Sequence, residues 1–241
     1  MAQGSGEGGR VLREGHPFVP YQTEPVTAEE TIWRATAHRD ASERRRSVRE
    51  FDRRDVPRAT IEQILLAAST SPSGAHRQPW TFVAVRNPAI KVKIREAAEE
   101  EERRNYSGRM PEDWLAALAP LGTDEVKTHL TDAPWIVVVF AQKHGLDDHG
   151  ERVKHYYVRE SVGMACGMLV AAAHAAGLAA LTHTPSPMAF LGELLGRPSH
   201  EQAYVVVPIG FPSPDCLVPD IRRKDLAEVG VFFDVDRIEG D

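Results

Sequence analysis

SPSGAHRQPWTFVAV, residues 71–85, joins a loop of small and polar residues to a run of apolar residues that alternates like a strand. The run covers residues 80–85 and is closed by Asn87-Pro88. Before the loop, a proline opens residues 57–68, and apolar side chains recur there at helical spacing. The sequence therefore predicts helix, loop and strand in this order. The loop permits close backbone approach to a planar ligand, although it could also be only a tight turn.

Working outward, the remaining pattern alternates helices and strands at unequal spacing, which favours a single α+β or mixed α/β domain. Residues 1–27 are expected to be a flexible arm and residues 28–241 the folded domain, beginning with a short helix over 28–38. The apolar run at 229–233 is predicted as a detached C-terminal strand. We predict helices at 90–106, 114–118, 124–130, 156–176 and 189–195, and strands at 135–140, 178–181 and 203–209. The unbroken apolar run at 135–140 indicates a strand buried on both faces.

Composition excludes several classes of protein. The chain has 241 residues and a net charge of -6, which argues against a surface that coats nucleic acid or anionic membrane. Cys166 and Cys216 lie far apart and outside metal-ligand spacing, so neither a disulfide framework nor a metal site is expected. Residues 161–181 lack charge but are rich in Ala and Gly, which favours a buried helix over a membrane span. No export signal is recognised, and a cytoplasmic location is expected.

Basic residues are concentrated at Arg44-Arg45-Arg46-Ser47-Val48-Arg49. Several guanidinium groups beside a hydroxyl suit a phosphate ester. A solvated basic turn that pairs with surface acids is the alternative, and the run alone does not decide between them. The triplet Arg222-Arg223-Lys224 has the same ambiguity. Neither a dinucleotide-binding glycine motif nor a P-loop occurs.

The charged run at 99–106 contains one acid without a basic partner at helical spacing. Glu99 and Glu100 are expected to pair with Arg103 and Arg104 four residues on, whereas Glu102 shares its face with Tyr106. Glu102 is therefore available for a ligand, unless the run is only a solvated helix face. Spacing alone does not distinguish Lys127.

Thr182-His183-Thr184-Pro185 follows a predicted strand, where loops often carry binding groups, although threonine is also common as a strand former. His183 could act as an acid or base, but a lone histidine is more often structural.

Several segments resemble the nitroreductase superfamily of FMN-dependent flavoproteins and, within it, the iodotyrosine deiodinase subgroup. They run in the same order from about Arg44 to Lys224, most of the chain. RRSVREF (45–51) and SPSGAHRQPWTFVAV (71–85) resemble the flavin fold strongly, and the set of Glu102, Tyr106 and Lys127 points to the subgroup. The other segments are KHYYVRESVGMACGMLVAAAHAAGL (154–178), LTHTP (181–185), ELLGRPSHE (193–201) and VPDIRRK (218–224).

This resemblance implies an intertwined homodimer whose protomers each have a mixed sheet flanked by helices, with two FMN sites at the interface. The residues it assigns to FMN are Arg45, Arg46, Ser47, Arg49, Ser73, Thr182, His183, Thr184 and Arg223. Thr182 and Thr184 are also the implied catalytic pair, hydrogen bonding near flavin N5, and His183 stands where the animal enzymes tend to have a third threonine. The residues it assigns to the substrate are Glu102, Tyr106 and Lys127, which hold an amino acid's ammonium and carboxylate, and Ala75, whose N–H meets the phenolate oxygen.

The implied activity is reductive dehalogenation of halogenated tyrosines, with electrons ultimately from NAD(P)H, either directly or through a reductase. The alternative is a broad nitro, quinone or flavin reductase of the same fold, which needs no zwitterion-binding triad. A third hypothesis, an anion- or nucleic-acid-binding module built on Arg44 to Arg49, is opposed by the net charge. We expect no membrane or nucleic-acid partner and no metal.

Overall fold

The computed structural model describes residues 9–233, and its contacts divide the chain into two units, with the division after Arg44. The first unit contains the hairpin of β1 (Val11–Arg13) and β2 (His16–Phe18) and the helix α1 (Ala28–Glu43). Glu14 and Gly15 both have positive φ, the geometry of a tight hairpin turn that the sequence analysis did not anticipate. Helix α1 begins as expected and runs beyond residue 38. The division at residue 27 stays a prediction.

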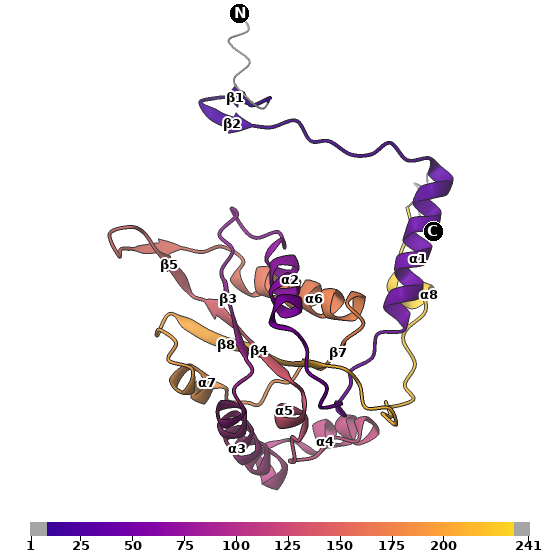
Figure 1. Ribbon diagram of the computed structural model, residues 1–241, viewed down its shortest axis with the longest axis vertical. Coiled ribbons are helices and arrows are strands. Elements are labelled where there is room, and N and C mark those ends of the chain that lie inside the picture. Colours follow the sequence, from indigo (N-terminus) through magenta and orange to yellow (C-terminus); the bar gives the residue numbers. More distant parts are fainter. Residues whose placement is uncertain (1–8, 234–241) are drawn as a thin grey trace, which may run out of the picture. The chain divides into compact units, whose positions relative to one another are not determined.

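The second unit holds most of the secondary structure (Figure 1). Its strands are β3 (Trp80–Val85), β4 (Trp135–Gln142), β5 (His144–Leu146), β6 (Arg152–Lys154), β7 (Ala179–Ala180) and β8 (Glu201–Gly210). Its α-helices are α2 (Arg58–Ser69), α3 (Pro88–Arg104), α4 (Glu112–Leu118), α5 (His129–Asp132), α6 (Val158–Ala175), α7 (Ala189–Leu194) and α8 (Leu226–Val229). A π-helical turn, η1 (Asn105–Arg109), continues α3, and a 3-10 turn, η2 (Ala119–Leu121), continues α4.

The main sheet has the strand order β3-β4-β8-β7, and all of its ladders are antiparallel. A parallel bridge between Ser47 and Ala180 adds the segment that precedes α2 to the edge at β7. The sheet is mixed through this bridge, and the predicted mixed α/β class is confirmed. The strand predicted at 178–181 is present as the two residues of β7.

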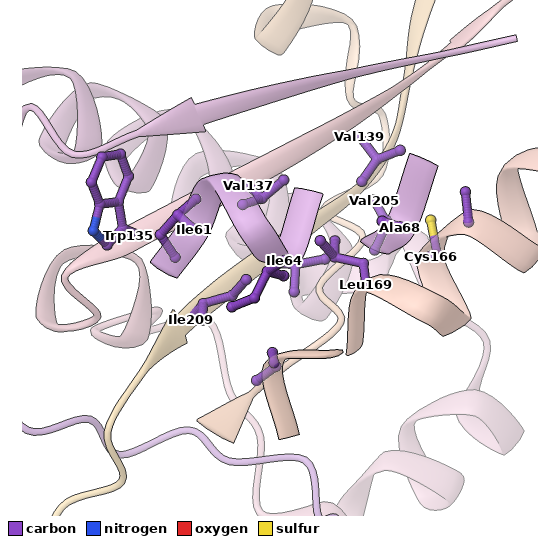
Figure 2. Packing of buried hydrophobic residues seen from close by; sticks show 14 of the residues in the cluster. Ile61, Ile64, Ala68, Trp135, Val137, Val139, Cys166, Leu169, Val205 and Ile209 are labelled. Carbon is purple, nitrogen blue, oxygen red and sulfur yellow. The ribbon is translucent and has the colours of Figure 1, made fainter. Parts of the chain in front are cut away.

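Helices cover both faces of the main sheet, and each face has its own core (Figure 1). Trp135, Val137 and Val139 of β4 pack with α2 and α6 on one face (Figure 2). Ile136 and Val138 pack with α3, α5 and α7 on the other. Alternate side chains of a strand point to opposite faces, so an unbroken apolar run fills both cores. The prediction that β4 is buried on both faces is confirmed.

Helix α6 accounts for the long uncharged stretch of the sequence. Val162, Ala165 and Leu169 are fully buried in the core that α6 shares with α2. Within residues 9–233, no helix is both long enough and apolar enough to cross a membrane.

The helix predicted at 124–130 is wrong for most of its range, because α5 covers only His129–Asp132. Side-chain carboxylates accept hydrogen bonds from backbone N–H groups that would donate to carbonyls in a helix. The Asp124 carboxylate accepts the N–H of Val126 at 2.9 Å, and the Glu99 carboxylate accepts the N–H of Lys127 at 2.8 Å. Asp side chains compete with helical hydrogen bonds in this way.

The strand predicted at 229–233 is also wrong. Residues 226–229 form the helix α8, started by a capping box between Asp225 and Glu228. Residues 231–233 belong to no strand, and their side chains are exposed, Phe233 at 92%.

Candidate functional site

The arginine segment, residues 45–49, is fixed beside β7. The N–H of Val48 donates to the Ala180 carbonyl at 3.3 Å, and the Val48 side chain is buried with Phe51. Arg223 donates to the carbonyl of Arg45 at 2.7 Å. Arg46 is already engaged, because its guanidinium donates to the carbonyl of Pro219. The structure therefore brings Arg223 beside the arginine segment.

Arg49 is one member of the segment that is suited to bind an anion. Its guanidinium is partly buried, and within residues 9–233 it has neither a hydrogen bond nor an ion pair. Burial lowers the pKa of Arg49. Burial is the main reason that the pKa values of Lys127, His129 and His183 are lowered, and the charge of Arg49 contributes to the lowering in each. A partly desolvated cation among other basic groups fits an anionic ligand such as the phosphate or the ring edge of FMN.

The loop Ser71–Gln78 is held in an unusual backbone conformation. Ala75, His76 and Gln78 all have φ near +50°, a region that non-glycine residues adopt rarely and mostly at functional sites. Gly74 is required where the loop meets the start of α6, because a Cβ there would lie 2.6 Å from the Tyr156 carbonyl oxygen.

Within this loop, Ser73 and Ala75 offer different groups. The Ser73 hydroxyl accepts the N–H of Gln78 at 2.9 Å and so closes the loop. The N–H of Ala75 has no hydrogen bond within the described part of the chain, and the residue is exposed. This free donor suits the predicted contact with a phenolate oxygen.

Side chains alternate along Thr182-His183-Thr184, so the two threonine side chains point to one side of the segment and the His183 side chain points to the other. Thr182 and Thr184 are exposed and line a cavity, whereas His183 is buried on the opposite side. The backbone of His183 pairs with Val206 of β8 through hydrogen bonds of 2.8 and 2.9 Å. Only the two threonine hydroxyls are therefore presented as donors, and the His183 side chain is directed toward Glu102 instead.

The cavity has a volume of about 1090 Å³, near the upper end for ligand pockets. Its lining includes Glu102, Asn105, Arg159, Thr182 and Thr184. The arginine segment and the loop Ser71–Gln78 do not line it. The hydroxyls of Thr182 and Thr184 make no hydrogen bond to other described residues, so they remain available to a polar ring. Together with the unpaired Arg49, these groups fit FMN.

The predicted substrate residues are assembled from three segments. Glu102 lies in the last turn of α3, Tyr106 in η1, and Lys127 just before α5. Lys127 Nζ lies 3.7 Å from Glu102 Oε2 and 5.8 Å from the centre of the Tyr106 ring. Both charged residues are buried, Glu102 at 6% exposure and Lys127 at 3%. The Tyr106 hydroxyl donates to the Thr123 carbonyl at 3.0 Å.

Burial and charge set the ionisation of this pair. Burial by itself raises the pKa of Glu102, but the hydrogen bond from His183 and the charge of Lys127 outweigh it, and the pKa lies below its ordinary value. Burial lowers the pKa of Lys127, and the Glu102 carboxylate only partly offsets this. Burial also raises the pKa of Tyr106. A buried carboxylate and a buried ammonium thus face each other at the end of α3.

The predicted ion pairs of the neighbouring acids, Glu99 and Glu100, are confirmed for Glu100 and wrong for Glu99. Glu100 pairs with Arg104 as predicted, at 2.9 Å, and also with Arg103. Glu99 does not bond to Arg103. It pairs with Arg95 at 2.6 Å and accepts the backbone N–H of Lys127. Glu102 lacks a basic partner on its own helix, as predicted, and finds one across the fold.

Sequence reasoning missed two residues of the site. His129, at the first position of α5, is buried against His183 at 3.3 Å between ring nitrogens. Asn105 follows the acidic run and donates to the Ser186 carbonyl at 3.0 Å, which ties η1 to the loop after Thr184. Neither contact leaves a local pattern, since the partners are 54 and 81 residues apart.

Comparison with known proteins shows which family the chain is similar to. The model of the nitroreductase family matches residues 43–211. An iodotyrosine deiodinase of the bacterium Haliscomenobacter hydrossis is 48% identical over 222 residues, which cover 92% of this chain and 100% of the relative. The iodotyrosine deiodinase of Hydra vulgaris is 42% identical, over 92% of this chain and 85% of its own length. Human iodotyrosine deiodinase 1 is 40% identical, over 90% of this chain and 76% of its own length.

Solved structures show the same fold. A crystal structure of oxidized iodotyrosine deiodinase bound to FMN and 3-iodo-L-tyrosine aligns with a TM-score of 0.69 and 27% identity, over 81% of this chain and 100% of that chain. A putative NAD(P)H nitroreductase from Bacteroides thetaiotaomicron aligns with a TM-score of 0.56 and 20% identity, over 81% and 96%, which supports the fold alone.

Proposed function

Because the chain belongs to the nitroreductase family, we propose that it is an FMN-dependent oxidoreductase that reductively removes halogen from halogenated tyrosines. The observation that carries this function is the buried pair of Glu102 and Lys127, 3.7 Å apart, beside Tyr106. A general nitro or quinone reductase has no need for it. The relatives that are 40–48% identical carry the same activity in their names.

The pair suits the head group of an amino acid. A zwitterion has an ammonium and a carboxylate, and Glu102 and Lys127 offer one opposite charge to each. Without ligand, each side chain serves as the other's counter-ion, so neither is buried alone. When the zwitterion binds, its carboxylate replaces Glu102 as the partner of Lys127. Tyr106 covers the ammonium of Lys127 on one side.

The residues proposed to hold FMN come from separate segments of the chain. Arg45, Arg46, Ser47, Arg49 and Arg223 contribute charge and polar groups for the phosphate and the ring edge, and Ser73 adds a contact from the loop Ser71–Gln78. Thr182 and Thr184 present hydroxyls to the ring near N5. When bound, FMN supplies the two electrons that, with one proton, convert the carbon–halogen bond into carbon–hydrogen and halide. The N–H of Ala75 is proposed to hold the phenolate oxygen.

The assembly is proposed to be a homodimer. The loop Ser71–Gln78 does not line the cavity that holds Glu102, Thr182 and Thr184. We propose that a second protomer contributes the loop, so that all proposed contacts meet on one ligand. The electron donor is proposed to be NAD(P)H, used directly or through a reductase, and the location cytoplasmic. Anaerobic mixing of the oxidised flavoprotein with NADPH or NADH, without any reductase, distinguishes the two routes of electron supply.

The decisive experiment is a single turnover without oxygen. FMN-loaded protein is reduced with dithionite and mixed with 3-iodotyrosine, and tyrosine, iodide and oxidised flavin are measured. Equal amounts of all three products are expected. If iodotyrosine leaves the flavin reduced while a simple nitroarene oxidises it, the chain is a nitroreductase in function and the proposal is wrong.

A further inference from the structure

Two buried histidines extend the substrate pair inward. His183 Nε2 lies 3.3 Å from Glu102 Oε1, and His183 Nδ1 lies 3.3 Å from His129 Nε2. The two rings meet edge to face, with centroids 5.1 Å apart. Glu102, His183 and His129 therefore form one row, which comes from α3, the loop after β7 and the start of α5.

When both rings are neutral, only one proton arrangement satisfies every contact in this row. The Glu102 carboxylate accepts hydrogen bonds, so His183 must carry its proton on Nε2. If His183 is neutral, its Nδ1 is then an acceptor, and His129 must donate from its own Nε2. Neutral rings are favoured here. Burial, together with the charges of Lys127 and Arg49, lowers the pKa of both histidines, that of His129 to about 3.

The groups around the row hold it in place. Arg95 of α3 bonds to the Thr131 hydroxyl of α5 at 3.0 Å, and Lys91 bonds to the carbonyls of Thr131 and Ala133. Glu99 binds the N–H of Lys127. These contacts fix the start of α5, which carries His129, against the helix that carries Glu102. The charged and titratable groups facing the histidines are Glu102, Lys127, Arg49 and Arg95.

We propose that His129 and His183 are positioning residues for the substrate ammonium. His129 fixes the tautomer of His183, and His183 holds Oε1 of Glu102, which leaves Oε2 directed at the ammonium. Oε2 is the oxygen that faces Lys127 in this structure. Neither histidine touches the substrate. This inference rests on the proposed function, because it assigns the ammonium to Glu102.

Binding of two matched ligands to the FMN-loaded protein tests the inference. The ligands are 3-iodotyrosine and its deaminated analogue, an iodinated hydroxyphenylpropanoate. The dissociation constant of the analogue divided by that of iodotyrosine isolates the ammonium contact, and a larger ratio means a stronger contact. His183→Leu is expected to reduce this ratio about tenfold, the effect of losing one charge-assisted hydrogen bond. His183→Gln, whose amide can donate from the same place, is expected to restore most of it. His149→Gln, on the exposed turn between β5 and β6, is the control.

A double variant tests whether His129 acts through His183. His129→Leu is expected to lower the ratio in the wild-type chain but to leave it unchanged in the His183→Gln chain, which lacks the ring tautomer that His129 selects. Nitrogen-15 NMR of the histidines gives an independent readout at pH 7. Both rings should be neutral and protonated on Nε2, and His129→Leu should change the tautomer of His183.

The outcomes separate the two proposals. If wild-type protein binds both ligands equally, Glu102 does not hold the ammonium, and the proposed function fails with the inference. If wild-type protein prefers iodotyrosine but the ratio survives His183→Leu, the inference alone is overturned. A His183 that is cationic or protonated on Nδ1 also overturns it.

Discussion

Replacing Glu102 by Gln is the sharpest test of the zwitterion site. The substitution keeps the shape of the side chain and removes its charge. Glu102 and Lys127 are 6% and 3% exposed, so solvent screens their charges poorly. Truncating one partner of such a buried charged contact costs about 2–5 kcal/mol. At about 1.4 kcal/mol for each factor of ten, the dissociation constant of iodotyrosine should rise about 30- to 4000-fold.

The assay measures two substrates in parallel. Iodotyrosine binding is followed by quenching of flavin fluorescence, and nitroarene turnover reports on the flavin site itself. Glu102→Gln should weaken the first and leave the second within about threefold, a change below 0.7 kcal/mol. Glu100→Gln, two residues earlier on α3 and with its side chain 46% exposed, is the matched control and should change neither. Equal losses on both substrates, or full retention of iodotyrosine affinity, would refute the zwitterion assignment.

Further predictions concern the cofactor, the loop, acid stability and assembly. Arg49→Ala should weaken FMN retention by about 1.5–3 kcal/mol, the contribution of one charged hydrogen bond, whereas Arg53→Ala, exposed and four residues on, should not. Gly74→Ala, whose Cβ would lie 2.6 Å from a backbone oxygen, should lower both Tm and FMN content, in contrast to Gly192→Ala, where no atom lies within 4 Å. The pKa of Glu102 lies below its ordinary 4.5, so its stabilising contribution is present above that pH and is lost as pH falls through the folded pKa. Urea unfolding should accordingly show a gap in the free energy of unfolding between wild type and Glu102→Gln at pH 6 that narrows progressively as the pH falls below 4.5. Light scattering should give a dimer at low micromolar concentration, and a flavin-loaded monomer would contradict the assembly.

Local patterns were sufficient for much of the fold. The predicted strands at β3 and β4 agree with the structure to within two residues, because their apolar runs are bounded by proline or charge. The helix α6 follows from its length and its uncharged composition. Errors came where side chains replaced backbone hydrogen bonds. The carboxylates of Asp124 and Glu99 accept hydrogen bonds from the N–H groups of residues 126 and 127. No sequence pattern predicts a contact between residues 99 and 127.

In the candidate site, too, residues with a local sequence pattern could be predicted, and residues defined by contacts across the fold could not. Glu102 can be singled out from the sequence because helical geometry assigns partners to its neighbours and none to it. Lys127 and His129 cannot, since their significance lies in contacts across the fold. For His183 the sequence left two hypotheses open, a role as an acid or base and a structural role. Its ring is turned away from the cavity that Thr182 and Thr184 line, a consequence of the alternation along an extended segment.

The site also has an imbalance of charge that bears on its ligands. Burial and, to a lesser extent, the charges of Arg49 and Lys127 lower the pKa values of His129 and His183, and the Glu102 carboxylate contacts Lys127 and His183. Burial and mutual repulsion keep the two histidines neutral, so the remaining positive charge falls on Arg49 and Lys127. Lys127 has Glu102, but Arg49 has no counter-ion within residues 9–233. The zwitterionic head group of the substrate adds no net charge, its phenolate adds one negative charge, and FMN adds a phosphate. We therefore propose that FMN supplies the anion that balances Arg49, because the negative groups of the substrate already have proposed partners in Lys127 and the N–H of Ala75.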